Sequence, residues 1–401
     1  MITLEKALET VIREVKTLPS EKVKLLSSLN RVLAEDIYSE FDIPQFNRAA
    51  MDGYAVIAQD TASASLSHPA VLKIVDEASA GFKAKLKVKR GKAVRIMTGA
   101  LLPEGADAVV MLEDTESDKD EVKIFRSIKQ GRNVSFSGED VKRGEKILSC
   151  GTLIRPAEVG MLASLSKRQV YVVKKPRVAI ISTGSELTEP GDALKEGKIY
   201  DSNSFALFSQ VVTCGGEPER IGIVPDDEKE LLLKVKEALS FDILLLSGGV
   251  SAGKYDLVKE VLKKAGVKML FWKVAVKPGK PTFFGVKNHT LVFGLPGYPV
   301  SSMMNFENLV KPAIFSMLGR KDYKRFKVRA TLKGEIRNTS NRENFIRVKL
   351  IEEDGKYLAY PAPSQKSGVL KSMVWANGII PLPKDVKKVE SGKQVLVEIL
   401  S

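Results

Sequence analysis

The sequence predicts a multidomain α/β plus β protein, and three observations support this fold class. Between Lys175 and Arg320, apolar runs typical of strands alternate with stretches typical of helices. Such alternation predicts a three-layer α/β domain, a doubly wound sheet covered by helices. Short strand-like segments separated by glycines fill residues 41–138, and strand-like segments return from Arg320 to Leu400. These two regions predict an inserted β-rich module and a small C-terminal β-barrel or sandwich.

The elements of the alternating region can be placed from its apolar runs. The predicted strands are RVAIIST (177–183), RIGIV (220–224), ILLLS (243–247), VKML (267–270), TFFGV (282–286) and TLVFGL (290–295). The predicted helices cover 202–213, 227–239, 255–265 and 300–318. The run 243–246 is too short and too apolar for a surface helix, which favours a parallel strand buried on both faces.

The remaining segments complete a prediction of four domains. Residues 2–16 place their apolar side chains on one helical stripe, which predicts an amphipathic helix. Residues 21–40 predict a short helix followed by a strand near 34–38, and Pro156 opens a later helix. The predicted domains are a helical and extended linker domain (1–40 and 139–173), the inserted β-rich module (41–138), the α/β domain (174–320) and the C-terminal β domain (321–401).

The composition argues against several classes of protein. The 401 residues include 63 Lys and Arg against 49 Asp and Glu, a net charge of +14. These basic residues are dispersed and lack interleaved aromatic residues, so we predict no nucleic-acid binding. No segment approaches the roughly 20 apolar residues that span a bilayer, and the charged N-terminal helix is unlike a signal peptide. We therefore expect a cytoplasmic protein that does not bind membranes.

Cysteine and histidine are too scarce for several common kinds of site. Cys150 and Cys214 are far apart, and His68 and His289 are the two histidines. This pattern indicates no disulfide framework and no zinc site, and it argues against Ser–His catalysis. The site must therefore work with carboxylates, lysines, hydroxyl groups and backbone groups.

Polar residues and glycines follow the predicted strands of the α/β domain. Ligands of open α/β sheets bind outside the carboxyl ends of the strands. The residues expected there are Thr183, Gly184, Glu186, Asp226, Ser247, Gly248, Gly249, Ser251, Asp256, Lys277, Lys280, Pro296, Gly297 and Pro299. Lysines and free backbone N–H groups bind phosphate or an oxyanion, and carboxylates suit Mg²⁺. The predicted chemistry is therefore phosphate chemistry with positioned charges.

Plainer alternatives exist for these residues. The spacing of Gly248, Gly253 and Lys254 almost completes a P-loop, but Tyr255 stands where the Mg²⁺-binding Ser or Thr belongs, so we reject a nucleoside-triphosphatase. The acids that precede helices could be only N-caps, and the prolines could only shape the start of the last helix. Clustering at one sheet edge favours function, because caps and turns have no reason to gather there. Asp52, Thr98 and Asp140 gain no such support from the sequence alone.

The motifs, taken in order, resemble those of one known family. They are AMDGYA (50–55), RIMTGA (95–100), GED (138–140), STGSEL (182–187), SGGVS (247–251), KPGKP (277–281) and LPGYPVS (295–301). The chain resembles, over essentially its whole length, the MoeA family of molybdopterin molybdenumtransferases, which is related to the E domain of gephyrin. Two positions depart from the family pattern: Tyr298 replaces a common asparagine, and Ala49 replaces a frequent serine.

The resemblance implies a molybdopterin-binding α/β domain and an elongated homodimer whose active cleft is lined by both subunits. The implied reaction inserts molybdate or tungstate into adenylated molybdopterin and releases AMP, with Mg²⁺ involved. Both oxyanions stay candidates because they have nearly the same size and charge. The adenylyltransferase of the same pathway is a candidate partner.

The resemblance also implies roles for particular residues. The implied catalytic residues are Asp52, Thr98, Asp140, Glu186, Asp226, Asp256, Lys277 and Lys280. Glu186, Asp226 and Asp256 are assigned to the pterin or to Mg²⁺, and the two lysines to molybdate or phosphate. Asp52, Thr98 and Asp140 would reach the cleft from the partner's β module. The cofactor-binding residues are Thr183, Gly184, Ser247, Gly248, Gly249, Ser251, Pro296, Gly297 and Pro299.

Two other functions stay open at this point. One is a scaffold that binds molybdopterin without turnover, which would not need the intact acids. The other is the adenylylation step that precedes insertion, because single-domain relatives share the α/β fold and the GGVS-type turn. The β module with AMDGY and the C-terminal domain favour insertion.

Overall fold

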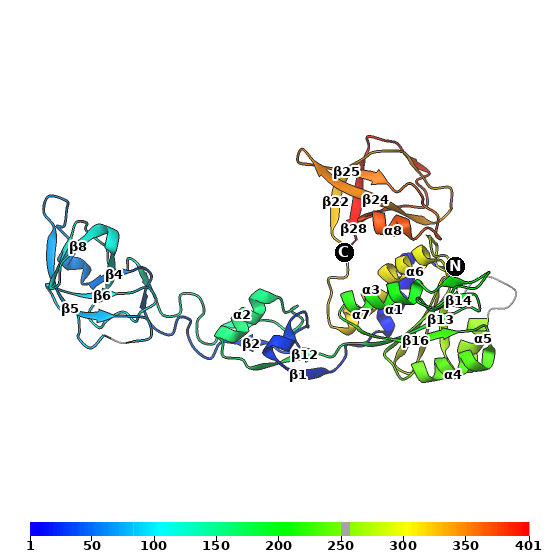
Figure 1. Cartoon of the computed structure of the whole chain (residues 1–401), viewed down its shortest axis with the longest axis horizontal. Coiled ribbons are helices and arrows are strands. Elements are labelled where there is room, and N and C mark those ends of the chain that lie inside the picture. Colours follow the sequence, from blue (N-terminus) through cyan, green and yellow to red (C-terminus); the bar gives the residue numbers. More distant parts are fainter. Residues whose placement is uncertain (83, 250–256, 401) are drawn as a thin grey trace. The chain divides into compact units, whose positions relative to one another are not determined.

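The structure, a computed structural model, describes residues 1–82, 84–249 and 257–400. The chain divides into two compact units, each described by itself (Figure 1). Unit 1 comprises Met1–Ala34, Gly151–Arg155 and Gln169–Ser401, and unit 2 comprises Glu35–Cys150 and Pro156–Arg168. The finer division into four domains stays a prediction.

Unit 2 is built on a six-stranded sheet in the order β7-β4-β6-β5-β9-β8. Its strands are β4 (Gly53–Val56), β5 (Ala70–Ala78), β6 (Lys92–Ile96), β7 (Ala108–Met111), β8 (Thr115–Ser117) and β9 (Glu121–Ile124). Successive side chains of a strand point to opposite faces. Accordingly, Ala55 and Val94 belong to one apolar core, and Tyr54 and Ala93 belong to another.

Smaller elements complete unit 2. β2 (Ile37–Tyr38) pairs with β11 (Lys146–Leu148), and β3 (Arg48–Ala49) pairs with β10 (Val134–Ser135). Helix α2 (Pro156–Ser164) begins at Pro156, as the sequence predicts.

The main sheet of unit 1 has six strands in the order β16-β13-β17-β21-β20-β18. They are β13 (Arg177–Thr183), β16 (Glu217–Val224), β17 (Ile243–Ser247), β18 (Lys268–Trp272), β20 (Phe283–Lys287) and β21 (Thr290–Leu295). β16, β13, β17 and β21 run parallel to one another.

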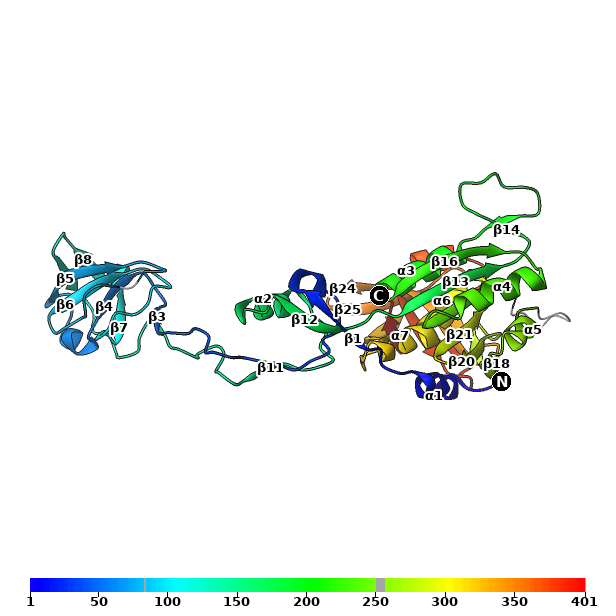
Figure 2. The same ribbon diagram turned by 90° about the horizontal axis from the view of Figure 1, so that it is seen from below.

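Helices cover both faces of this sheet (Figures 1 and 2). On β13, Val178 and Ile180 face one core, and Ala179 and Ile181 face the other. The first core is closed by α1 (Leu4–Glu14), α3 (Asn203–Thr213), α6 (Pro299–Asn305) and α7 (Lys311–Met317), with a π-helical segment Phe306–Val310 between the last two. The second is closed by α4 (Glu228–Ala238) and α5 (Leu257–Lys264). This confirms the predicted three-layer α/β fold.

The last strands of the sheet depart from a purely parallel pattern. β20 pairs antiparallel with β21 and with β18. The reason is a two-residue loop, since Lys287 pairs with Thr290 and Asn288 between them has φ 54°. Such a loop makes a hairpin, whereas a parallel connection needs a crossover of a dozen or more residues.

The predicted short helix after residue 20 is wrong. Ser20–Lys24 form strand β1, which pairs antiparallel with β12 (Gln169–Val173), and only Leu25–Ser28 make a short 3₁₀ turn. Along β1 the residues alternate between exposed and half-buried. That is the period of a strand with one covered face.

The C-terminal part of unit 1 is a closed five-stranded barrel. β24 (Glu343–Glu353), β25 (Lys356–Pro361), β22 (Lys327–Leu332), β28 (Gln394–Ile399) and β26 (Gly378–Leu382) follow one another, and β24 also pairs with β26. Its apolar core includes Leu332, Val348 and Val397. The predicted C-terminal barrel is therefore confirmed.

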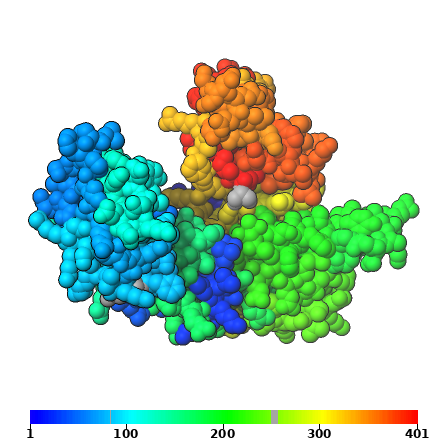
Figure 3. All heavy atoms as spheres, turned by 60° about the vertical axis from the view of Figure 1, so that its left-hand side comes forward, coloured from blue at the N-terminus to red at the C-terminus, as the bar shows by residue number. Residues whose placement is uncertain are grey.

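Short elements accompany the barrel. They are β23 (Ile336–Arg337) paired with β27 (Lys388–Val389), α8 (Lys371–Trp375) and β19 (Val276–Lys277), which pairs with β24. Figure 3 shows the orange and red C-terminal part seated on the green and yellow part of unit 1. In the described part of the chain, no helix has the length and apolarity that crossing a bilayer requires.

Candidate functional site

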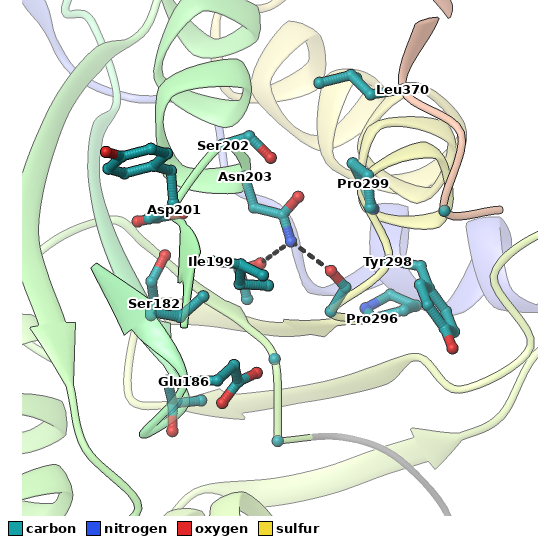
Figure 4. A pocket seen from close by; sticks show the side chains of 18 of the residues that line it. Ser182, Glu186, Ile199, Asp201, Ser202, Asn203, Pro296, Tyr298, Pro299 and Leu370 are labelled. Atoms are coloured by element: carbon teal, nitrogen blue, oxygen red, sulfur yellow. Dashed lines mark hydrogen bonds between the residues drawn. The ribbon is translucent and has the colours of Figure 1, made fainter. Parts of the chain in front are cut away.

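A pocket of about 730 Å³ opens in unit 1 at the carboxyl ends of β13, β17 and β21. Its lining comes from the segments 182–187, 199–203, 247–249, 281 with 296–299, and 368 with 370. Figure 4 shows side chains from these segments converging on one space. The position is where ligands of open α/β sheets bind.

Many of the site residues predicted for unit 1 meet at this pocket. Those lining it are Thr183, Glu186, Ser247, Gly248, Gly249, Pro296, Gly297 and Pro299. Gly184 lies between two lining residues, and α6 begins at Pro299. Proline suits the first position of a helix because its missing N–H would have no partner there. The roles of these residues stay predictions.

The glycine turn after β17 is tied to both neighbouring strands. The N–H of Gly248 donates to the carbonyl of Leu295 at 3.1 Å. Gly248 has φ +97°, and a Cβ there would lie 2.3 Å from the carbonyl oxygen of Thr183. A side chain is therefore excluded by close backbone approach as well as by conformation. The turn after β21 abuts it, since a Cβ on Gly297 would lie 3.6 Å from Gly248 Cα.

Asp226, which follows β16, is hydrogen-bonded to residues at the end of β13 and in the loop after it, but it is not among the described residues that line the pocket. Asp226 Oδ2 accepts from the backbone N–H of Ser185 at 3.3 Å, and Asp226 Oδ1 accepts from the Thr183 hydroxyl at 3.4 Å. Asp227, not Asp226, caps α4, because its side chain accepts from Glu230 N–H. The alternative that Asp226 serves only as an N-cap is therefore wrong.

Glu186 folds back over the glycine that precedes it. A Cβ on Gly184 would lie 2.6 Å from Glu186 Oε2. The absent side chain at this position therefore leaves room for the carboxylate, which lines the pocket. Among the described residues no three His, Cys, Asp or Glu side chains group as a metal site. Ser251 and Asp256, and the P-loop-like residues 253–255, lie outside the described residues.

The two predicted lysines are not among the described residues that line the pocket. Lys277 is half-buried in β19, opposite Asn344 of the barrel, and Lys280 is exposed. Their loop is fixed by buried Asn305, whose Nδ2 donates to the Gly279 carbonyl at 2.9 Å. Only the last residue of the KPGKP motif, Pro281, reaches the lining.

The structure adds Asn203 to the site, a residue that the sequence analysis missed. Asn203 Nδ2 donates to Ser247 Oγ at 2.9 Å and to the Gly297 carbonyl at 2.8 Å, as the dashed lines in Figure 4 show. One amide thus joins the turns that follow β17 and β21. Only its position in the sequence could have indicated Asn203, because it lies at the start of the helix predicted from residue 202.

The start of α3 is itself anchored. Buried Asp201 accepts from the backbone N–H of Ser204 at 3.0 Å and from its hydroxyl at 2.6 Å. Arg220 donates to Ser204 Oγ at 2.8 Å and stacks over the ring of Phe205, with its guanidinium carbon 3.8 Å from the ring centre. These contacts set where Asn203 enters the pocket.

The barrel contributes Gly368 and Leu370 to the lining. The segment before them is held by Arg347, which is 0% exposed. Its guanidinium donates to the carbonyl oxygens of Ser364 at 3.3 Å and Lys366 at 3.4 Å. Burial lowers the pKa of Arg347 to about 10, so it stays charged at neutral pH.

Three family models match consecutive parts of the chain. The MoeA N-terminal region (domain I and II) matches residues 2–166, the probable molybdopterin binding domain matches 179–316, and the MoeA C-terminal region (domain IV) matches 329–400. The molybdopterin molybdenumtransferase of Bacillus subtilis (strain 168) is 37% identical over 100% of this chain and 94% of its own length. The chain belongs to the MoeA family.

Further relatives agree with this membership. The molybdopterin molybdenumtransferase of Staphylococcus aureus (strain Mu50) is 34% identical over 98% of this chain and 94% of its own length. A crystal structure of the molybdopterin biosynthesis moeA protein from Pyrococcus horikoshii OT3 has a TM-score of 0.86 at 36% identity, covering 100% of both chains. These relatives support a role for this MoeA-family chain in molybdenum cofactor biosynthesis.

In unit 2 of this MoeA-family chain, Asp52 and Thr98 form a pair. Asp52 Oδ1 accepts from the backbone N–H of Thr98 at 2.6 Å and from its hydroxyl at 2.7 Å. The backbone N–H, and after it the hydroxyl, hold the pKa of Asp52 below its usual value. Both residues are exposed. Apart from the family resemblance, no local signal links these two residues, which are 46 positions apart.

Asp140, the third predicted acid of unit 2, is also exposed. Its backbone N–H donates to the Ile43 carbonyl at 3.0 Å. No hydrogen bond among the described residues links its side chain to Asp52 or Thr98. Its role therefore stays a prediction from the resemblance.

Proposed function

We propose that this MoeA-family chain is a molybdopterin molybdenumtransferase that acts on adenylated molybdopterin and molybdate or tungstate. In this reaction the two dithiolene sulfurs bond to the metal, one oxo group of the oxyanion leaves as water with the two thiol protons, and a second water cleaves the phosphoanhydride bond so that AMP leaves. The observation that supports it most is the pocket at the carboxyl edge of the sheet, in a chain that aligns over its full length with molybdenumtransferases. A pocket of about 730 Å³ is in the range of small-molecule sites.

One carboxylate that lines the pocket and one bonded to a lining residue suit the proposed Mg²⁺. Glu186 and Asp226 supply hard oxygen donors, which Mg²⁺ prefers together with water and phosphate oxygens. Asp256 is the third proposed ligand. Mg²⁺, when bound, would neutralise charge on phosphate oxygens. Glu186 and Asp226 would hold this ion beside the adenylated phosphate. Lys277 and Lys280, which lie outside the described pocket lining, would stabilise negative charge on phosphate or oxyanion.

The homodimer is part of the proposal. Asp52, Thr98 and Asp140 would complete the cleft of the partner subunit, as the family resemblance implies. The paired hydrogen bonds from Thr98 keep Asp52 ionised, which suits a residue that must present a fixed negative charge. A cytoplasmic location and delivery of the substrate by the adenylyltransferase of the same pathway belong to the same proposal, and cell fractionation and co-purification test them.

The deciding experiment incubates the purified full chain with adenylated molybdopterin, Mg²⁺ and either oxyanion. Release of AMP together with metal in the product is the expected result, and a competition between molybdate and tungstate gives the preference. Consumption of ATP with bare molybdopterin would instead indicate the adenylyltransferase. Binding of the substrate without AMP release would indicate a scaffold.

A mixing experiment tests the shared cleft. Asp52→Asn and Glu186→Gln chains, each expected to have very low activity alone, are unfolded together and refolded as mixed dimers. If the cleft uses Asp52 of one subunit and Glu186 of the other, half of the dimers are mixed and each regains one intact cleft, so about a quarter of wild-type activity returns. No recovery, with dimers confirmed by light scattering, would place both residues in one subunit's site.

A further inference from the structure

The amide of Asn203 has one possible orientation. The carbonyl of Gly297 can only accept a hydrogen bond, so the atom 2.8 Å from it must be the Nδ2 donor. The second hydrogen of Nδ2 goes to Ser247 Oγ at 2.9 Å. Both donors of the amide are therefore used by the two turns, and its oxygen must point elsewhere.

The oxygen of Asn203 lies on the side of Ser202 and Pro299 (Figure 4). Both of these residues line the pocket, as Asn203 does. Among the described residues none donates a hydrogen bond to Asn203 Oδ1. The pocket wall therefore presents a fixed carbonyl oxygen that can accept a hydrogen bond from a ligand.

This oxygen discriminates between the parts of the proposed substrate. Phosphate and molybdate offer only acceptor oxygens at neutral pH, and these are repelled by a carbonyl oxygen. The pterin carries amino and ring N–H donors on its edge, and the adenine carries an amino group. The nearby wall is also suited to a flat ring, because Pro299 and the 65% exposed Tyr298 flank the same turn.

We infer that Asn203 recognises an amino-heterocycle of the substrate: Oδ1 accepts a hydrogen bond from its N–H edge, while Nδ2 holds the two turns at the spacing this requires. The inference rests on the proposed function and deepens it. The heterocycle is either the aminopyrimidinone of the pterin or the aminopurine of the adenylyl group, which share this chemistry.

The experiment uses the full chain and combines a change in the protein with a change in the ligand, as in a double-mutant cycle. The ligands are 6-hydroxymethylpterin, followed by its fluorescence, and AMP, followed by calorimetry. Each is compared with an analogue whose N–H donors are methylated: the 2-dimethylamino-3-methyl pterin and N6,N6-dimethyl-AMP. The proteins are wild type, Asn203→Ala, and Asn341→Ala as a matched control at an exposed asparagine of the barrel part.

For one of the two parent ligands, we expect the effect of methylation on affinity to depend on Asn203. Wild type and Asn341→Ala bind that parent about tenfold more tightly than its methylated analogue, and Asn203→Ala loses this preference. The ligand that shows the loss identifies the ring. If Asn203→Ala weakens binding of the parent and the analogue equally, the inference is overturned, and Asn203 only joins the two turns.

A second variant separates recognition from clamping. Asn203→Asp keeps acceptor oxygens but cannot donate to Gly297, so it should bind the parent more weakly yet keep the preference over the analogue. Thermal unfolding checks that both variants fold. If wild type releases AMP and shows no preference, only this inference fails, whereas failure of wild type to bind either ligand would overturn the proposed function as well.

Discussion

Unit 1 and unit 2 hold their candidate residues in different ways. In unit 1, segments far apart in the chain meet around a pocket and are fixed by backbone contacts, such as Gly248 against Thr183. In unit 2, Asp52 and Thr98 form an exposed pair that is fixed by two hydrogen bonds. The pocket therefore has walls that could enclose a ligand, whereas the pair offers an exposed charge at the surface of unit 2.

This difference predicts that unit 1 binds the ligand and that the Asp52–Thr98 pair of unit 2 affects the rate of the reaction. Changes in the unit 1 pocket should weaken ligand binding, because they alter the shape of the cavity. Changes at the Asp52–Thr98 pair should slow the reaction and leave binding of a partial substrate such as AMP intact. The predictions below test this difference in roles, beginning with the largest expected effect.

Gly248→Ala should abolish binding of AMP to the pocket. The added Cβ would lie 2.3 Å from the Thr183 carbonyl oxygen, and φ +97° is unfavourable for alanine, so the turn must move. Gly392→Ala is the matched control, since Gly392 has φ +87° and no atom within 4 Å of an added Cβ. Calorimetry gives both affinities. Normal binding by the Gly248 variant would show that the turn does not shape the ligand site.

Asp52→Asn should lower the rate of AMP release on the order of a hundredfold, the usual cost of losing one positioned charge or proton carrier. AMP binding should not change, because the pocket lining belongs to unit 1. Asp118→Asn is the matched control, because Asp118 is another exposed acid of unit 2 whose pKa is lowered by backbone N–H groups. Loss of AMP binding in the Asp52 variant would contradict this difference in roles.

The parts of the site that the sequence predicted depend on local signals. The strands β13, β17 and β21 end where the sequence analysis placed their ends, because each buried apolar run is followed by glycine or proline. The general rule for parallel sheets then places the ligand site at the carboxyl ends of these strands. The short helix after residue 20 was wrong because charged residues masked the alternation of β1.

The contacts that complete the site could not be read from spacing. Asn203 is 44 residues from Ser247 and 94 residues from Gly297. Nothing local links them, and only the folded sheet brings the two turns to the start of α3. Likewise, Lys277 was expected at the sheet edge but belongs to β19, which pairs with the barrel strand β24.

Gly184→Ala should reduce AMP release about tenfold. Gly184 has φ +153°, which alanine rarely adopts, so the variant also carries backbone strain, as its control does. The added Cβ would lie 2.6 Å from Glu186 Oε2, so the flexible carboxylate, rather than the backbone, is displaced. Restoring activity with a higher Mg²⁺ concentration would support a role of Glu186 at the metal. The control is Gly191→Ala in the same connection, which has φ +103° and no neighbour within 4 Å. Equal activity of both variants would remove Glu186 from the site.

Thr98→Val should have the smallest effect, a shift in pH dependence. Valine removes the hydroxyl donor but keeps the backbone N–H, which is the larger cause of the lowered pKa of Asp52. The pKa of Asp52 should therefore rise part of the way toward its usual value. Because a lowered pKa keeps the carboxylate ionised until the pH falls through it, the acid limb of the activity profile should move to higher pH in the variant.

The shift can be measured in two independent ways. The pH profile of AMP release gives the acid limb, and an NMR titration of the Asp52 carboxyl carbon gives its pKa directly. Thr115→Val is the control, because it removes another threonine hydroxyl of unit 2, one that donates to the Leu112 carbonyl. It should leave both the acid limb and the pKa of Asp52 unchanged. A raised pKa of Asp52 with an unmoved acid limb would mean that the charge of Asp52 does not limit the reaction, and the exposed pair of unit 2 would then have only a structural part in the turn.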